Sequence, residues 1–206
     1  MKEYNTVVEI SQGRYEEKRS IFIAELFPCE GPEQAAQIVA AQKSKYWDAR
    51  HVVHAYCLAD GSVKAADDGE PHGTSGKPVL DIITGTGLKN VLITVTRYFG
   101  GVLLGTGGLV RAYSAAARQA VDNAKTVTMC PGIQFICNLD YQQYQTMQRL
   151  MYSNNCIVDN SEFNDNVMLE FTVPLDVCER FKDEITEVFA GKIQLIVKKE
   201  IFFVKK

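Results

Sequence analysis

Hydrophobic and polar positions along the first part of the chain change between strand spacing and helix spacing. Alternating or continuous apolar runs predict β-strands at residues 6–10, 20–27, 52–58 and 90–96. Apolar residues at helical spacing predict helices that begin at Pro32, at Pro78 and at about Leu109, the last reaching Ala124. Residues 59–76 are polar and glycine-rich, which predicts a loop.

The same kind of pattern restarts after Pro131 and Gly132. It predicts a strand, a helix, two strands, a helix and a final strand at residues 133–139, 141–153, 155–160, 167–173, 175–190 and 193–204. The order βαββαβ is typical of a ferredoxin-like sandwich. The sequence therefore predicts an α+β chain with two domains, residues 1–131 and residues 132–206.

The composition is that of a folded protein without membrane segments. Hydrophobic residues make up 46% of the chain and aromatic residues 10%, enough for real cores. No apolar run approaches the roughly 18–20 residues of a membrane span, and the first residues lack the features of a signal peptide. The six cysteines are scattered without a C-x-x-C pair, which favours buried, reduced thiols. We therefore expect a cytoplasmic protein with no membrane partner and no cofactor.

The distribution of charge and the number of histidines bear on two kinds of site, a nucleic-acid surface and a metal site. The net charge is −3, but residues 1–131 carry 14 basic and 14 acidic residues, against 8 and 11 in residues 132–206. A nucleic-acid surface must therefore be a local patch on the first domain, and no DNA sequence specificity is expected. The three histidines form no cluster of metal ligands, so no metal site is expected.

Two glycine-rich clusters carry the candidate chemistry, at residues 67–78 and 97–111. In the second cluster a buried strand runs into a glycine loop and then into a helix, an order that presents backbone N–H groups to an anion. Arg97 and Arg111 stand at its two borders, and a guanidinium binds phosphate well. We therefore expect an anion site at the amides of residues 105–108. Neither the P-loop nor the complete G-x-G-x-x-G motif is present.

A structural interpretation of both clusters competes with the functional one. Arg97 could pair with Asp68 or Glu70 instead of an anion. The three carboxylates at positions 67, 68 and 70 could hold Mg²⁺ or act as acid and base, or they could cap the helix that Pro78 opens, with Thr74 or Ser75 at its N-cap. No nucleophile–base pair is visible, which favours a binding protein over an enzyme.

The candidate binding residues come from both clusters and share small size, charge or a hydroxyl. They are Asp67, Asp68, Glu70, Gly73, Thr74, Lys77, Arg97, Gly100, Gly101, Gly105, Thr106, Gly107, Gly108 and Arg111.

The two clusters resemble the motifs of the YigZ/IMPACT family. The segment D-D-G-E-P-H-G-T-S-G-K-P at residues 67–78 and the segment V-T-R-Y-F-G-G-V-L-L-G-T-G-G-L-V-R-A-Y at residues 95–113 occur in the family's order. The segment D-A-R-H at residues 48–51 is similar to the family's D-A-x-H. His72 stands where the family pattern has serine or another small residue.

This resemblance implies a fold and a cellular context. The first domain is expected to resemble the second domain of ribosomal small-subunit protein S-five, and the second to resemble a domain of elongation factor G. Eukaryotic members of the family regulate translation by competing for the activator of a stress-response kinase. The resemblance thus implies a non-catalytic, translation-linked regulator that binds RNA, a ribosome-associated component or a protein partner through the glycine-rich face.

Two other functions stay open on the sequence. The first is an enzyme that acts on a phosphorylated small molecule or a nucleotide, an analogy that rests on the fold alone. The second is a protein-interaction module in which the apolar residues 98–99 and 102–104 dock a partner.

Overall fold

The computed structural model describes residues 2–204. They divide into two compact units, which we call the first unit (residues 4–128) and the second unit (residues 129–204 with residues 2 and 3). Strand β7 runs through Pro131 and Gly132, which pair with Phe202 and Ile201 of the last strand. The sequence pattern had placed the start of this strand at Ile133. The domain division at Gly132 stays a prediction.

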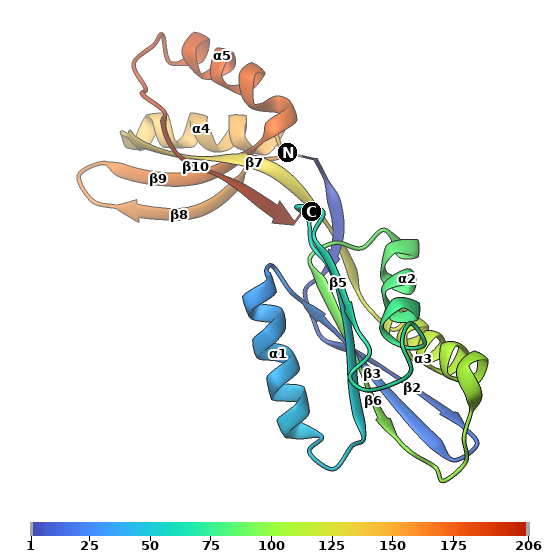
Figure 1. The fold of residues 1–206 in the computed structure, drawn as a ribbon. Coiled ribbons are helices and arrows are strands. Elements are labelled where there is room, and N and C mark those ends of the chain that lie inside the picture. The colour runs from blue at the N-terminus through green and yellow to red at the C-terminus, as the bar shows by residue number, and fades with distance from the viewer. Residues whose placement is uncertain (1, 205–206) are drawn as a thin grey trace. The chain divides into compact units, whose positions relative to one another are not determined.

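The first unit contains a five-stranded antiparallel sheet with helices on both faces (Figure 1). The strand order is β2-β3-β6-β4-β5. The bounds are β2 Ser11–Glu17, β3 Ser20–Pro28, β6 Val91–Tyr98, β4 His51–Cys57 and β5 Val63–Ala66, and the short strand β1 spans Tyr4–Val7. Seven of the eight residues of β6 are buried, as its β-branched sequence predicts for a central strand.

Helix α1 (Pro32–Lys45) covers one face of this sheet, and helices α2 (Gly76–Thr86) and α3 (Gly105–Asp122) cover the other (Figure 1). The buried face of α3 consists largely of alanine, which lets the helix approach the sheet closely. At Gly13 of β2, an added Cβ atom would lie only 2.4 Å from the backbone N of Ala120. Small residues on both elements therefore set the distance between α3 and β2.

Besides small shifts at the ends of β1 and α2, three details of the first unit differ from the sequence prediction. Strand β2 was not predicted because its sequence SQGRYEE is polar, and β5 lies in the segment predicted as a loop. Both are the outermost strands of the sheet, where one edge faces solvent and polar residues are tolerated. Helix α3 begins at Gly105 instead of about Leu109, so the glycines at 105, 107 and 108 form its first turn.

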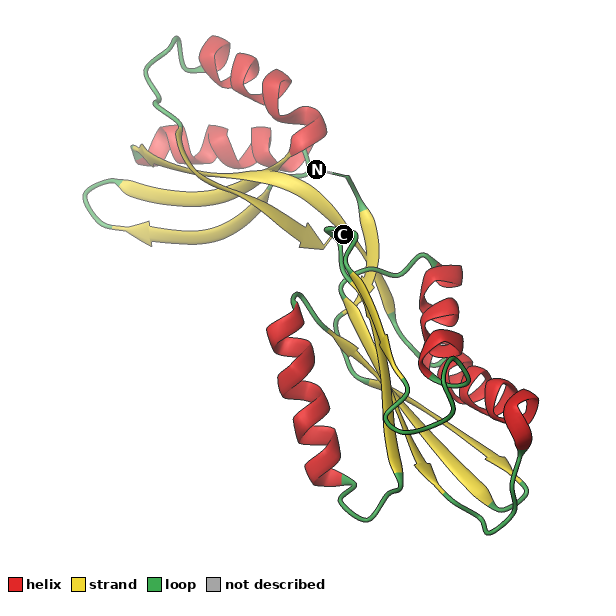
Figure 2. Cartoon of the chain, viewed as in Figure 1, coloured by secondary structure: helices red, strands yellow, loops and turns green. Residues whose placement is uncertain are grey.

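The second unit is a ferredoxin-like sandwich, as the sequence predicted. Its sheet order is β10-β7-β9-β8, and all neighbouring pairs are antiparallel. The strands are β7 Thr126–Leu139, β8 Ile157–Phe163, β9 Val167–Pro174 and β10 Ile196–Val204, and the helices are α4 Tyr141–Ser153 and α5 Cys178–Val188, the latter after a short 3₁₀ turn at Leu175–Val177. Both helices pack on one face of the sheet (Figure 2). Asp140 and Gln143 form a capping box that fixes the start of α4. The α+β fold class is thereby confirmed.

Candidate functional site

The two glycine-rich clusters meet at the side chain of Glu70. Arg97 Nη1 donates a hydrogen bond to Glu70 Oε1 at 2.6 Å, and the Tyr113 hydroxyl donates to the same oxygen at 2.8 Å. Glu70 is only 8% exposed and Arg97 only 5%. Burial, together with the negative charge of Glu70, raises the pKa of Tyr113, so its phenol stays neutral and acts as a donor. The sequence left open whether Arg97 binds an anion or pairs with Asp68 or Glu70. In the structure Arg97 pairs with Glu70.

Aromatic rings and a histidine complete the surroundings of this ion pair. The Arg97 guanidinium lies 5.6 Å from the centroid of the Phe22 ring and 5.5 Å from that of Phe99. His51 Nδ1 lies 2.7 Å from the backbone oxygen of Asp68, and because a carbonyl only accepts, Nδ1 carries the proton. His51 Nε2 is 3.9 Å from Glu70 Oε1. The network thus ties β4, β6 and α3 to the loop that precedes α2.

Asp67 organises the loop before α2. Its carboxylate accepts hydrogen bonds from the backbone N–H groups of Gly73, Ser75 and Gly76, at 2.9, 3.3 and 2.8 Å, and from the Ser75 hydroxyl at 2.7 Å. Burial raises the pKa of Asp67, but these hydrogen bonds outweigh burial and hold the pKa below its usual value. Asp67 therefore caps the start of α2 from a distance of nine residues.

We expect the replacement Asp67→Ala to lower the free energy of unfolding at neutral pH by about 0.5–2 kcal/mol, the usual cost of losing a cap. The folded-state pKa lies below the unfolded one, so this stabilisation is complete above about pH 4 and is lost as the pH falls through the folded-state value. Urea unfolding of both proteins at neutral pH and near pH 3 measures the effect. The difference should shrink in acid, whereas the control Asp81→Ala on the exposed face of α2 should change little at either pH. A difference that is constant with pH would contradict this role.

The loop between β6 and α3 is fixed by one close backbone approach. The Gly100 N–H donates to the Ser20 hydroxyl at 3.0 Å, and a Cβ atom added at Gly100 would lie 2.1 Å from the carbonyl carbon of Arg19. Gly101 and Gly105 have φ angles of 82° and 70°, which favour glycine. The first turn of α3 has no side-chain cap, and its residues 105–107 are exposed.

The predicted site residues separate into two groups by exposure. The residues used within the fold are Asp67, Asp68, Glu70, Thr74, Arg97, Gly100 and Gly108. The exposed residues are Gly73, Lys77, Gly101, Gly105, Thr106, Gly107 and Arg111, of which Lys77 pairs with Asp81 on the next turn of α2. His72 lies fully exposed at the tip of the first cluster. Arg97 and Arg111 therefore differ in environment, and the anion site between them stays a prediction.

Sequence reasoning missed several residues that the structure adds to this region. Tyr113 was not among the candidate residues, yet its hydroxyl is part of the Glu70 network. Trp47 and Arg50 belong to the loop between α1 and β4, where residues 48–51 match a family motif but no binding role had been assigned. The Arg50 guanidinium lies 5.6 Å from the centroid of the Phe99 ring in the glycine loop. An aromatic residue beside a free arginine in a short polar loop was the local signal that could have pointed to them.

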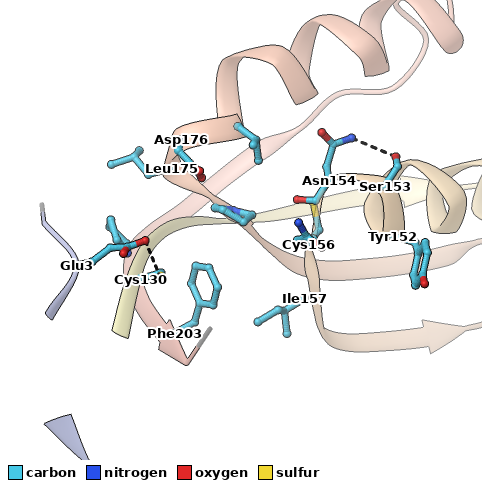
Figure 3. A pocket seen from close by; sticks show the side chains of 14 residues that line it. Glu3, Cys130, Tyr152, Ser153, Asn154, Cys156, Ile157, Leu175, Asp176 and Phe203 are labelled. Atoms are coloured by element: carbon cyan, nitrogen blue, oxygen red, sulfur yellow. Dashed lines mark hydrogen bonds between the residues drawn. The ribbon is translucent and has the colours of Figure 1, made fainter. Parts of the chain in front are cut away.

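A cleft of about 900 Å³ lies in the second unit, at the C-terminal end of α4 (Figure 3). Two thiols line it. Cys130 bonds to the Glu3 carboxylate, and burial raises the pKa of Cys156 to about 12, so this thiol is protonated and a poor nucleophile. The Asn154 side chain is also engaged within the unit, because it donates to Glu184 and accepts from Arg180. These polar groups stabilise the cleft wall.

Three general features concern the chain between residues 2 and 204. No group of three or more His, Cys, Asp and Glu side chains in this range is arranged to hold a metal ion. No helix in this range is both long and apolar enough to cross a membrane. All six cysteines are free.

Comparison with known proteins identifies related domains and relatives. Residues 18–121 match the Impact N-terminal domain, and residues 137–192 match a domain of unknown function, DUF1949. The IMPACT family member YigZ of Escherichia coli (strain K12) is 33% identical, with 95% of each chain covered. The IMPACT family member YvyE of Bacillus subtilis (strain 168) is 29% identical over 92% of this chain and 88% of the relative. A crystal structure titled as that of a hypothetical protein is similar at a TM-score of 0.67, with 30% identity, and covers 97% of this chain and 98% of that one.

Proposed function

The chain belongs to the IMPACT family, and from this membership we propose that it is a non-catalytic binding protein with a translation-linked regulatory role. The relationship to the family that the motifs suggested is thereby confirmed. In this proposal the protein acts in the cytoplasm, in keeping with its six free thiols. Its partner is RNA, a ribosome-associated component or a protein of the translation machinery.

The exposure of the loop after β6 is the observation that carries this proposal. Leu103 is 82% exposed, and Phe99 and Val102 of the same loop are exposed as well. Single exposed apolar residues are common, but several in one loop with a fixed backbone mark an interaction site. The backbone is fixed because Gly100 packs against the β2–β3 turn. This glycine-rich face is therefore prepared for a partner at little cost in conformational entropy.

The first turn of α3 adds an electrostatic component to the same face. The exposed residues 105–107 carry N–H groups at the positive end of an 18-residue helix, which favours a negatively charged group. Arg111 is exposed one to two turns further along. A phosphate or a carboxylate of a partner suits this position.

The environment of the polar motif residues favours binding over catalysis. Glu70, Arg97 and Tyr113 are buried and bonded to one another, and Asp67 is engaged in capping α2. Groups that satisfy each other inside the fold stabilise the scaffold on which the exposed loop is mounted.

We expect the replacement Leu103→Ser to lower the amount of ribosomal material captured from lysate about tenfold, because a buried leucine contributes roughly 1.5–3 kcal/mol to an interface. The tagged full-length chain is the bait, and capture is repeated after nuclease treatment to separate RNA from protein partners. The matched control is Val63→Ser, which changes another exposed aliphatic residue of the first unit. Equal capture by the wild type and both variants would refute the glycine-rich face as the binding surface.

A further inference from the structure

Three surface segments of the first unit lie at one end of its sheet. Strands β3 and β4 are both antiparallel to β6, so the start of each lies beside the end of β6 (Figure 1). The segments at this end are the turn at Lys18 and Arg19, the loop at residues 46–50 and the loop at residues 99–104. Segments far apart in the sequence thus form one surface, which we call the strand-end surface.

Hydrogen bonds hold the loop at residues 46–50 in place. Lys45 Nζ donates to the buried Glu25 at 2.8 Å, the Tyr98 hydroxyl donates to Asp48 at 2.9 Å, and the Arg50 N–H donates to the Arg97 carbonyl at 3.2 Å. Each of these bonds joins the loop or its border to the sheet. The position of Trp47 between them is therefore determined by the fold.

Trp47 is 83% exposed on this anchored loop. A tryptophan side chain carries one of the largest apolar surfaces of any residue, so its exposure costs free energy unless a partner covers it. The Arg50 guanidinium lies over the neighbouring Phe99 ring, which is itself partly exposed. The strand-end surface therefore offers flat aromatic faces next to a cation.

The charges of the strand-end surface are mostly positive and uncompensated. Within residues 2–204, the side chains of Lys18, Arg19 and Arg50 form no ion pair with a carboxylate. Asp48 in these segments and Glu17 beside the turn accept hydrogen bonds from tyrosine hydroxyls. The cations are thus available to a ligand, although the whole first unit is close to neutral.

The backbone conformation of the β2–β3 turn is a second indication that its two basic residues serve a ligand. Lys18 and Arg19 have φ angles of 46° and 68°, in the left-handed region where a two-residue turn prefers asparagine and glycine. Two basic residues at these positions cost conformational energy. Strained residues that are not glycine cluster at functional sites, so this turn is a candidate for contact with a ligand.

We propose that the strand-end surface binds single-stranded RNA, with an unpaired base stacked on Trp47 and phosphates held by Arg19 and Arg50. This inference rests on the proposed binding function and specifies its partner. Exposed aromatic faces beside free cations suit single strands, because only unpaired bases can leave their neighbours to stack on a side chain. The backbone N–H groups in the first turn of α3 lie next to this surface and can bind a further phosphate of the same RNA strand.

The test uses the full-length chain and a short, fluorescently labelled oligouridylate. Trp47 is the only tryptophan of the chain, so quenching of intrinsic fluorescence reports stacking at this position alone. We expect quenching together with binding that weakens steeply with salt. Trp47→Ala and Arg50→Ala should each lower the affinity about tenfold, and Arg50→Ala should also reduce the salt slope by about one.

The matched controls lie in the second unit. Tyr152→Ala removes an aromatic side chain that is 88% exposed, and Arg149→Ala removes an exposed arginine of α4; both should leave the affinity unchanged. Binding without quenching, equal affinity for duplex RNA, or full affinity in Trp47→Ala would overturn the inference. Oligouridylate that fails to bind would overturn it too. In any of these cases the capture experiment decides whether the proposed binding function survives. If Leu103→Ser lowers nuclease-resistant capture about tenfold, the binding function stands with a protein partner. If Leu103→Ser leaves capture unchanged, both proposals fail.

Discussion

The replacement Arg97→Ala should lower the free energy of unfolding of the first unit by about 3–5 kcal/mol, because it leaves a buried carboxylate without its ion-pair partner. Arg97 and Glu70 are both almost fully buried, and their ion pair is 2.6 Å long. Without the guanidinium, the Glu70 carboxylate keeps only the hydrogen bond from Tyr113. A buried charge that loses its partner destabilises the fold much more than an exposed pair does.

Urea unfolding followed by circular dichroism measures this change, and Arg111→Ala provides the matched control. Arg111 is exposed on α3, so its replacement should leave stability within about 0.5 kcal/mol of the wild type. The same two variants also test the predicted anion site, because oligouridylate affinity can be measured on each. If Arg97→Ala unfolds like the wild type but loses affinity, then Arg97 serves a ligand and the ion pair is incidental.

The replacement Gly100→Ala should cost about 3 kcal/mol or more and should displace the glycine-rich loop. The new Cβ atom would lie 2.1 Å from the Arg19 carbonyl carbon and 2.3 Å from the Ser20 backbone N, and a backbone neighbour has no rotamer with which to move away. Overpacking against side chains typically costs about 1–3 kcal/mol, and a clash with backbone lies at the upper end of this range or beyond it. The loop, the β2–β3 turn or both must shift.

Gly85→Ala is the matched control for this prediction. Gly85 lies within α2, and an added Cβ atom would meet nothing within 4 Å. Alanine is the better helix former, so this variant should gain up to about 1 kcal/mol. Thermal unfolding of both variants measures the contrast. A Gly100→Ala variant as stable as the wild type would show that the loop and the turn do not depend on their close approach.

Much of the fold could be predicted from the sequence because its signals are local. The restart of the pattern after Pro131 predicted the order βαββαβ, since strand and helix periodicities are readable within ten to fifteen residues. The capping residues of α4 and the buried run of β6 are signals of the same kind. The family motifs were equally readable, because each is a continuous stretch of sequence.

The outer strands of the first sheet and the start of α3 could not be predicted in this way. Strands β2 and β5 are polar, and their conformation comes from pairing with β3 and β4. The glycines at 105, 107 and 108 have low helix propensity, so the helix begins there only because the tertiary structure places the chain in that conformation.

The sequence by itself determined the two candidate clusters and the order of most helices and strands, and the tertiary structure decided which candidate residues are exposed and which of them meet. It identified Arg97 as a border of the glycine loop, but only folding brings Arg97 and Tyr113, 27 and 43 residues after Glu70, onto the same Glu70 oxygen. It gave no reason to join Trp47 to Phe99, which the antiparallel pairing of β4 with β6 brings to one end of the sheet. The physical reason is that periodicity and capping depend on neighbours along the chain, whereas a site depends on strand register and burial, which only the assembled sheet defines.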